Sequence, residues 1–212
     1  MRVKICGVTQ LKQAQAIANL GADTLGFICF PPSPRYLNPQ GIKSIIEDLP
    51  ESIKCIGVFV NASWQVIHDT VLETGLTGVQ LHGDESAEFC LSLRRISANL
   101  EVIKALRVKG KETLSQVAIY ADCVDTLLLD AYDPNLKGGT GKTLPWLSLQ
   151  SFTAPLPWLL AGGLTPDNLS LALSQLQPDG IDLSSGVERS PGDKDLERVA
   201  RLFEQLKLSR FT

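Results

Sequence analysis

Apolar residues along this chain gather in eight short runs, and an amphipathic stretch follows each one. The runs are rich in aliphatic and β-branched residues, which is typical of buried strands, and they cover residues 2–6, 23–29, 54–60, 78–82, 101–106, 124–130, 157–160 and 180–183. Helix-like patterns cover residues 9–22, 39–49, 62–75, 86–97, 111–121, 143–151, 165–176 and 194–206. We expect Thr9 to cap the first helix, Gly21 to end it, and Thr165 with Pro166 to begin the seventh.

The spacing of these runs predicts a closed barrel. Strands that alternate with helices form a parallel sheet, and eight such units in 212 residues leave about 26 residues for each unit. An open doubly wound sheet is the alternative, but no G-x-G-x-x-G follows the first strand. No linker or change of composition divides the chain. We therefore predict an α/β fold, a single-domain (β/α)8 TIM barrel over residues 1–212.

Composition and charge exclude several kinds of partner. The chain has 20 Lys and Arg against 23 Asp and Glu, with no block of like charge, so we expect no nucleic-acid or anionic-membrane surface. Its apolar runs are shorter than the roughly 20 residues of a membrane helix, and its first residues lack a signal-peptide pattern. Five widely spaced cysteines without C-x-x-C, and two histidines, predict a reducing cytoplasm and no metal site.

Chemistry-bearing residues follow the predicted strands. The segments after the strands read CGVT, FPPSPRY, HGDE, DAYDPNLKGGTGKT, AGGL and SSGVERSPGD, whereas the connections at the other ends look like plain turns. In barrel enzymes the active site lies where strands run into the following loops. The loops after residues 29 and 130 are the longest, so we expect them to act as lids.

Cys6 ends the first strand. Side-chain alternation places Lys4 on the same inward side, while Val3 and Ile5 face the helices. A neighbouring ammonium group lowers the pKa of a thiol, so Cys6 could serve as a base or nucleophile. The alternative is a buried, inert cysteine.

Asp130 ends the apolar sixth strand. Desolvation at the barrel mouth would favour the protonated form of this carboxyl group, which could then act as a general acid. The alternative is a loop cap or an ion pair.

The loops after the seventh and eighth strands favour phosphate binding. Glycines let a backbone approach an anion closely, seryl hydroxyls add donors, and a short helix near Ser184 would point its positive end at the site. The candidate residues are Gly162, Gly163, Ser184, Ser185 and Gly186. Ordinary strand-to-helix turns are the alternative.

The segment GGTGKT (138–143) is similar to a nucleotide-binding loop. The full motif requires glycine where Leu136 stands and a normal helix afterwards, so we reject this interpretation. A glycine-rich lid whose backbone, including Gly139, adds to the phosphate site fits better.

Arg35 and His82 are further candidates for contact with a ligand. Prolines at 31, 32 and 34 restrict the loop of Arg35 and could orient its guanidinium to bind a carboxylate, although it could also simply cover the barrel surface. His82 ends the fourth strand and could donate to a substrate oxygen or only satisfy a neighbour.

Eight segments together carry a specific resemblance. In order they are KICGVT, LGFICFPPSPRYL, IGVFV, VQLHGDE, LLLDAYD, GGTGKT, LAGGLTPDNL and GIDLSSGVERSPGDKD, and they resemble the phosphoribosylanthranilate isomerase family of tryptophan biosynthesis from residue 2 to about 203. The departures are the valine of CGVT and the LPW after GGTGKT, and they affect only the packing expected of the short sixth helix.

This resemblance implies an Amadori rearrangement without metal or cofactor. N-(5-phosphoribosyl)anthranilate would become 1-(2-carboxyphenylamino)-1-deoxyribulose 5-phosphate. Position by position, Cys6 would be the general base, Asp130 the general acid and Arg35 the clamp for the anthranilate carboxylate, while the AGG and SSG residues would bind phosphate. Since no obligate interface is marked, we expect a monomer, with a homodimer as the alternative.

Other functions fit the sequence less well. An indole-forming synthase barrel would need a longer N-terminal extension, and a sugar-phosphate epimerase commonly uses more metal-binding histidines than the two present here. A non-catalytic phospho-ligand binding protein would keep AGG and SSG but has no reason to place Cys6 and Asp130 at the barrel mouth.

Overall fold

Eight parallel strands close into one barrel, as the spacing predicts. The computed structural model describes residues 1–96, 99–108, 110–130, 146 and 149–208. Each strand pairs with its sequence neighbours, and the eighth pairs with the first. The strands are β1 (Arg2–Cys6), β2 (Thr24–Ile28), β3 (Lys54–Phe59), β4 (Gly78–Leu81), β5 (Glu101–Arg107), β6 (Thr126–Asp130), β7 (Trp158–Ala161) and β8 (Gly180–Leu183).

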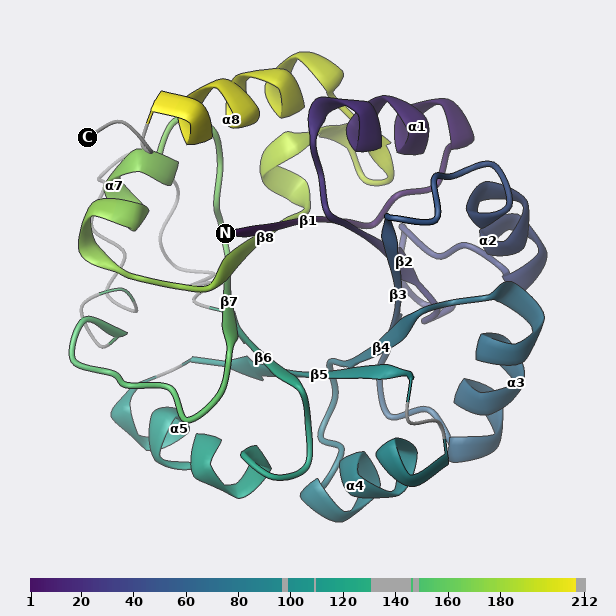
Figure 1. Cartoon of the computed structure of the whole chain (residues 1–212), viewed down its shortest axis with the longest axis vertical. Helices are drawn as coiled ribbons and strands as arrows, with labels where there is room; N and C mark the ends of the chain where they lie inside the picture. Colours follow the sequence, from purple (N-terminus) through teal and green to yellow (C-terminus); the bar gives the residue numbers. More distant parts are fainter. Residues whose placement is uncertain (97–98, 109, 131–145, 147–148, 209–212) are drawn as a thin grey trace.

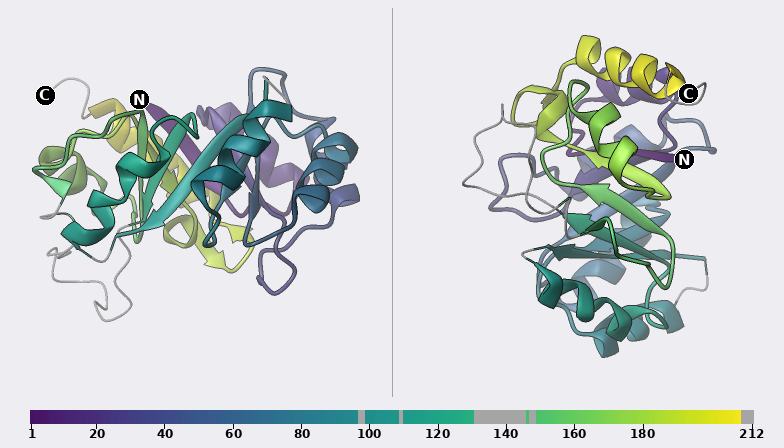
Figure 2. Two further views of the ribbon diagram at one scale, coloured as in Figure 1. Left: turned by 90° about the horizontal axis from the view of Figure 1, so that it is seen from below. Right: turned by 90° about the vertical axis from the view of Figure 1, so that its left-hand side faces the viewer.

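Helices surround the ring of strands (Figure 1). They are α1 (Leu11–Leu20), α2 (Pro39–Ile46), α3 (Trp64–Thr74), α4 (Ala87–Ile96), α5 (Lys111–Ser115), the 3-10 helix η1 (Val117–Tyr120), α7 (Leu169–Gln175) and α8 (Leu196–Leu208). The last helix lies beside the first and closes the outer layer (Figures 1 and 2). The helix expected over 111–121 is divided in two, and the one expected over 143–151 falls mostly outside the described residues. No described helix is both long and apolar enough to cross a membrane.

The predicted helix ends are partly correct. Gly21 ends α1 in the left-handed conformation, at φ 115°. Thr9 does not cap this helix: Gln10 is the N-cap, and the Thr9 hydroxyl instead donates to the Gly192 carbonyl at 2.6 Å. Thr165 accepts a hydrogen bond from the backbone of Asn168, so it closes the turn before α7 rather than the first turn of the helix itself.

Side chains alternate between two apolar layers. Val3 and Ile5 face outward and belong to the large cluster between the sheet and the helices, whereas Lys4 and Cys6 face the interior. A second apolar cluster fills the inside of the barrel and consists of Ile56, Ile103, Ala105, Leu128, Leu159 and Ala161. This filled interior forms the floor on which the mouth of the barrel rests.

The turns at the amino-terminal ends of the strands are secured by acidic side chains. Asp23, Asp125 and Asp179 each accept a hydrogen bond of 2.8–2.9 Å from a backbone N–H of the preceding strand. These contacts join successive βα units at the end of the barrel opposite the predicted site.

A hairpin follows β8 and was not predicted. After the 3-10 helix η2 (Ser185–Val187), β9 (Glu188–Ser190) pairs antiparallel with β10 (Asp193–Lys194). The turn between them uses Gly192 at φ 83°, a conformation that favours glycine. The hairpin brings Glu188 and Lys194 to the edge of the barrel mouth.

Candidate active site

A cavity of about 450 Å³ opens at the carboxyl ends of the strands, and every strand contributes to its lining. All the predicted site residues that the structure describes line this one cavity: Cys6, Arg35, His82, Asp130, Gly162, Gly163, Ser184, Ser185 and Gly186. Gly139 lies outside the described residues. The structure therefore places the predicted base, acid, arginine, histidine and phosphate loops at one site.

Cys6 lies beside Lys4 at the wall of this cavity. A Cβ added to Gly26 would be 2.7 Å from Cys6 Sγ and 3.1 Å from Lys4 Nζ, so the thiol and the ammonium converge on the space that this glycine leaves open. The predicted lowering of the thiol pKa is wrong in its net direction. Burial raises the pKa of the Cys6 thiol, and the opposing effect of Lys4 is smaller.

The Lys4 ammonium is held by Asp182, on the neighbouring strand β8. Lys4 Nζ lies 3.0 Å from Asp182 Oδ1, and both side chains are buried. Burial is the largest single effect and lowers the pKa of Lys4, but the charges and hydrogen bonds of Asp182 and Cys6 together outweigh it, so the pKa is raised and the ammonium stays charged. A fixed positive charge therefore lies next to the thiol, where it stabilises a thiolate once one forms.

Asp130 faces the same cavity from the end of β6. About a fifth of its side chain is exposed, and its Oδ2 lies 3.7 Å from Nε2 of His82. His82, directly after β4, in turn contacts Gln80 on β4, with 2.8 Å between Gln80 Nε2 and His82 Nδ1. The acid candidate is thus joined to a chain of polar groups that begins inside the barrel.

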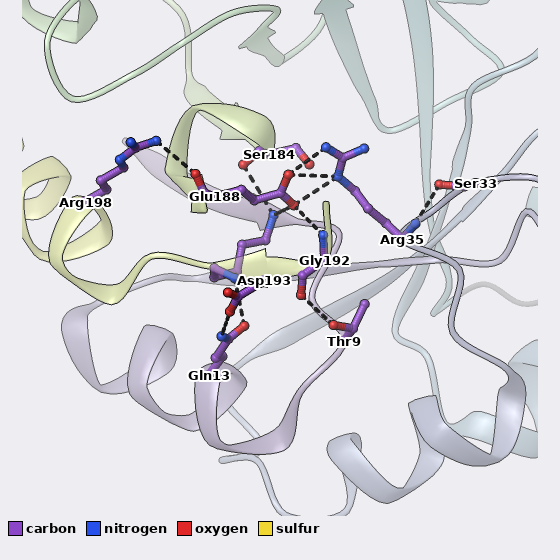
Figure 3. A network of polar contacts seen from close by, with 10 residues as sticks. Thr9, Gln13, Ser33, Arg35, Ser184, Glu188, Gly192, Asp193 and Arg198 are labelled. Carbon is purple, nitrogen blue, oxygen red and sulfur yellow. Dashed lines mark hydrogen bonds and ion pairs between the residues drawn. The ribbon is translucent and has the colours of Figure 1, made fainter. Parts of the chain in front are cut away.

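Arg35 reaches from the loop after β2 to the hairpin after β8 (Figure 3). Its Nε lies 3.0 Å from both carboxylate oxygens of Glu188, and its Nη2 lies 2.6 Å from Oε2. Lys194 Nζ holds the same carboxylate at 2.6 Å. Burial is the largest single effect and raises the pKa of Glu188, but the hydrogen bonds and positive charges of Arg35 and Lys194 together outweigh it and hold the pKa below its ordinary value.

This cluster of Arg35, Glu188 and Lys194 carries two positive charges and one negative charge. Because Glu188 is paired with both Arg35 and Lys194, its carboxylate would keep Lys194 as a partner if Arg35 bound another anion. The excess positive charge at the cavity wall suits a ligand with acidic groups. The sequence predicts that the proline-rich loop orients Arg35. The structure adds an acidic partner, Glu188, which the sequence did not reveal.

The loops after β7 and β8 touch each other and form one cradle. Gly162 and Gly163 have φ of 93° and 64°, which side chains rarely adopt. A Cβ on Gly186 would lie 1.8 Å from the Leu164 carbonyl oxygen, so only glycine allows this contact between the two loops. The short helix expected near Ser184 is present as η2. These features give the close backbone approach that an anion site requires.

A second cavity, of about 820 Å³, adjoins the first over the ends of β3, β4 and β5. The two cavities share Val60, His82 and Arg107. Arg107 is exposed and its backbone is in register with Asp130. The opening at this end of the barrel therefore extends beyond the cavity that the predicted site residues line.

Sequence reasoning missed several polar residues of the site. They are Gln80, Arg107, Asp182, Glu188 and Lys194. Alternation along GVQLH and GIDL would have turned Gln80 and Asp182 inward, but the partners of Glu188 and Lys194 depend on a hairpin with no sequence signal. Within the described ranges, no group of three or more His, Cys, Asp or Glu could hold a metal ion.

The amino-acid sequence is similar to known proteins along nearly its whole length. A family model described as N-(5'phosphoribosyl)anthranilate (PRA) isomerase matches residues 3–205. A protein of that name from Gloeothece citriformis is 62% identical over 97% of this chain and 94% of its own length. Another from Trichormus variabilis is 61% identical over 97% and 98%.

Solved structures agree. The isomerase from Thermotoga maritima matches with a TM-score of 0.88 and 36% identity, over 98% of both chains. A phosphoribosylanthranilate isomerase in complex with reduced 1-(o-carboxyphenylamino)-1-deoxyribulose 5-phosphate matches with a TM-score of 0.83 and 34% identity, over 98% of both chains. On the extent of these matches, this chain belongs to the N-(5'-phosphoribosyl)anthranilate isomerase family.

Proposed function

We propose that this protein converts N-(5-phosphoribosyl)anthranilate into 1-(2-carboxyphenylamino)-1-deoxyribulose 5-phosphate, an Amadori rearrangement in tryptophan biosynthesis. Membership of the isomerase family supports the proposal. The observation that carries it is the presence of a thiol, a carboxyl group and a glycine-lined cradle around one cavity. Each of these groups has a part in the reaction.

Ring opening comes first. Asp130, in its protonated form, donates a proton to the furanose ring oxygen, and the bond between that oxygen and C1 breaks. The nitrogen lone pair forms the C=N bond of an iminium ion at C1. The carboxyl group becomes a carboxylate next to the new cation.

Proton removal from C2 follows. The iminium ion makes the C2 hydrogen acidic, so the Cys6 thiolate is a strong enough base to take it. The electrons of the C–H bond form the C1–C2 double bond of an enolamine and neutralise the nitrogen. Gain of a proton at C1 and loss of the proton on the C2 hydroxyl give the ketone, so the reaction is a net isomerisation.

The buried Lys4–Asp182 pair supports the base. Because the Cys6 thiol is buried, its charged form is costly, and the ammonium of Lys4 offsets part of that cost. The carboxylate of Asp182 keeps Lys4 charged. Lys4 thus acts through Cys6 and is a positioning residue of the site.

The two ends of the substrate are anions, and the site has a place for each. The cradle formed by Gly162, Gly163 and Ser184–Gly186 would hold the phosphate, and Arg35 would bind the anthranilate carboxylate. Anchors at both ends would hold the sugar between the acid and the base. Such positioning lowers the barrier of the reaction, because the reacting groups are already in place.

A turnover assay tests the proposal. Anthranilate-type fluorescence disappears as phosphoribosylanthranilate is converted, so purified protein should cause that loss, and the product should contain the ketose. A protein that binds the substrate without converting it would support a phospho-ligand binding role instead. Formation of an indole when the ketose product is supplied as the substrate would support a synthase.

Oligomeric state and cellular location are separate proposals. We infer a monomer, because the exposed large apolar side chains, among them Val66, Leu72, Ile119 and Leu171, are spread over α3, η1 and α7 rather than gathered on one element. The Thermotoga maritima relative is described as dimeric. Light scattering should give 23.0 kDa, and twice that mass would show a dimer.

A cytoplasmic location is supported by the chemistry of the cysteines. All five cysteines are free thiols, and free thiols are typical of a reducing compartment. Cell fractionation should recover the activity with cytoplasmic enzymes.

A further inference from the structure

A buried amide oxygen in the floor of the cavity has no partner. The Gln80 side chain is 1% exposed and lines the cavity, yet its Oε1 accepts no hydrogen bond from any described residue. Buried polar atoms nearly always have a partner, and leaving one unpaired is costly. An acceptor left open at the wall of a ligand cavity therefore points to a donor on the ligand.

The neighbours of Gln80 cannot supply that donor. On β4, Gln80 faces the inside of the barrel, and its backbone is in register with Val58 on β3 and Ile103 on β5. The side chains of both neighbours are apolar. The two residues in register with Gln80 therefore leave its Oε1 without a donor, although the residue lines the cavity.

The other end of the amide sets the state of His82. Gln80 Nε2 lies 2.8 Å from His82 Nδ1. With the amide nitrogen placed toward His82, the amide donates and Nδ1 accepts, and this orientation puts the proton of a neutral imidazole on Nε2. That Nε2–H lies on the side of Asp130, whose Oδ2 is 3.7 Å away.

We propose that Gln80 is a substrate-contacting residue: its Oε1 accepts a hydrogen bond from a sugar hydroxyl, and the same amide holds His82 as an Nε2–H donor directed at Asp130. The proposal rests on the function proposed above. Phosphate and carboxylate offer only acceptors to this oxygen and are bound elsewhere. Of the donors between the two anions, which are the amine N–H at C1 and the hydroxyls at C2 and C3, we assign a hydroxyl to this oxygen. One side chain thus joins recognition of the sugar to orientation of the acid.

A double-mutant cycle on the ligand tests the sugar contact. Binding of the reduced product analogue is compared with binding of its 2-deoxy and 3-deoxy forms, for the natural protein and for Gln80→Met. In the natural protein, removal of one of these hydroxyls should weaken binding about three- to tenfold, the range of a single neutral hydrogen bond. In Gln80→Met the same removal should have no effect. Equal losses in the two proteins would overturn the proposal.

Inorganic phosphate and Gln65→Met serve as controls. Phosphate affinity should not change in Gln80→Met, because the cradle is on the loops after β7 and β8. Gln65 lies on α3, where it bonds to Asp69 on the exposed helix surface, so the same substitution there should leave the cycle unaltered. If Gln80→Met does not fold, Gln80→Leu, which also lacks an acceptor, replaces it.

Nitrogen NMR of the histidine rings tests the second half of the proposal. The chain has only two histidines, so His68, on α3 and away from the cavity, is an internal reference. The natural protein should show His82 with Nδ1 bare and Nε2 protonated. In Gln80→Glu the carboxylate would accept from a protonated Nδ1, and the His82 signals alone should move. An unchanged His82 tautomer would overturn the proposal.

These outcomes are distinct from a failure of the proposed function. The NMR measurement needs no turnover. A natural protein without isomerase activity would refute the proposed function and the sugar contact with it, whereas an active protein with no coupling between Gln80 and either hydroxyl would refute the sugar contact alone.

Discussion

Cys6 and Asp130 face one cavity from β1 and β6, and the two strands between them, β7 and β8, carry the cradle loops. We expect a ligand whose phosphate lies in that cradle to have its sugar within the space that the thiol and the carboxyl group share. Positions 124 residues apart in the chain thus meet because the barrel closes, with β8 paired to β1.

The first prediction concerns the base. Cys6→Ala removes the only group of β1 that can take the C2 proton at the cavity wall, so kcat should fall about 10²- to 10⁴-fold while the affinity for inorganic phosphate stays nearly unchanged. The fluorescence assay measures this. Cys123→Ala, at a half-buried cysteine outside the cavity, should keep full activity. Unaltered turnover in Cys6→Ala would remove this thiol from the mechanism.

The second prediction concerns the acid. Asp130→Asn keeps the shape of the side chain but cannot protonate the ring oxygen, so kcat should again fall by orders of magnitude with little change in phosphate affinity. Asp167→Asn is the matched control, because Asp167 is exposed and pairs with Arg201 on α8. If Asp130→Asn turns over at the natural rate, ring opening depends on another donor.

The third prediction concerns binding. Arg35→Ala should raise KM for phosphoribosylanthranilate more than it lowers kcat, since it removes an anchor and leaves the reacting groups in place. Glu188 keeps its partner Lys194, so the thermal unfolding temperature should change little. Arg201→Ala, on the exposed surface, controls for the loss of an arginine. An unchanged KM would show that Arg35 only secures the hairpin.

The fourth prediction concerns pH. Burial raises the pKa of the Cys6 thiol, and Lys4 lowers it, so the thiolate forms as the pH rises through a value above that of an ordinary thiol. Lys4→Met removes the lowering effect and should move this transition to still higher pH. The rate of Cys6 alkylation by iodoacetamide at each pH, measured by mass spectrometry of its peptide, reports the transition.

The groups around Cys6 define the control for that experiment. Lys4, Asp182 and Lys194 act on the thiol electrostatically, as do Cys29 and Arg35 from the side of β2. Lys12→Met changes an exposed lysine on α1 and should leave the profile in place. A transition at lower pH in Lys4→Met would contradict the role given to Lys4.

The fold could be predicted because it is repeated along the chain. Eight apolar runs at similar intervals leave few other ways to bury both faces of each strand, and the barrel then places every strand end at one mouth. Cys6, Asp130 and the AGG and SSG segments could be placed at the site for that reason alone.

The remaining parts of the site depend on contacts between distant residues. Lys4 meets Asp182 across 178 residues, and Arg35 meets Glu188 across 153, through a hairpin of β9 and β10 with no apolar pattern of its own. The sign of the Cys6 pKa shift also required the structure, because it depends on how far burial outweighs the ammonium nearby. Neither the long-range ion pairs nor the net direction of the Cys6 pKa shift is encoded in a local sequence pattern.

A crystal structure of this protein with the reduced product analogue tests the central claim most directly. We expect the phosphate on the loops of Gly162 and Ser184, and the sugar within about 3 Å of both Cys6 Sγ and an Asp130 oxygen. A complex in which the phosphate occupies another place, or in which either group lies beyond the reach of the sugar, would contradict the mechanism.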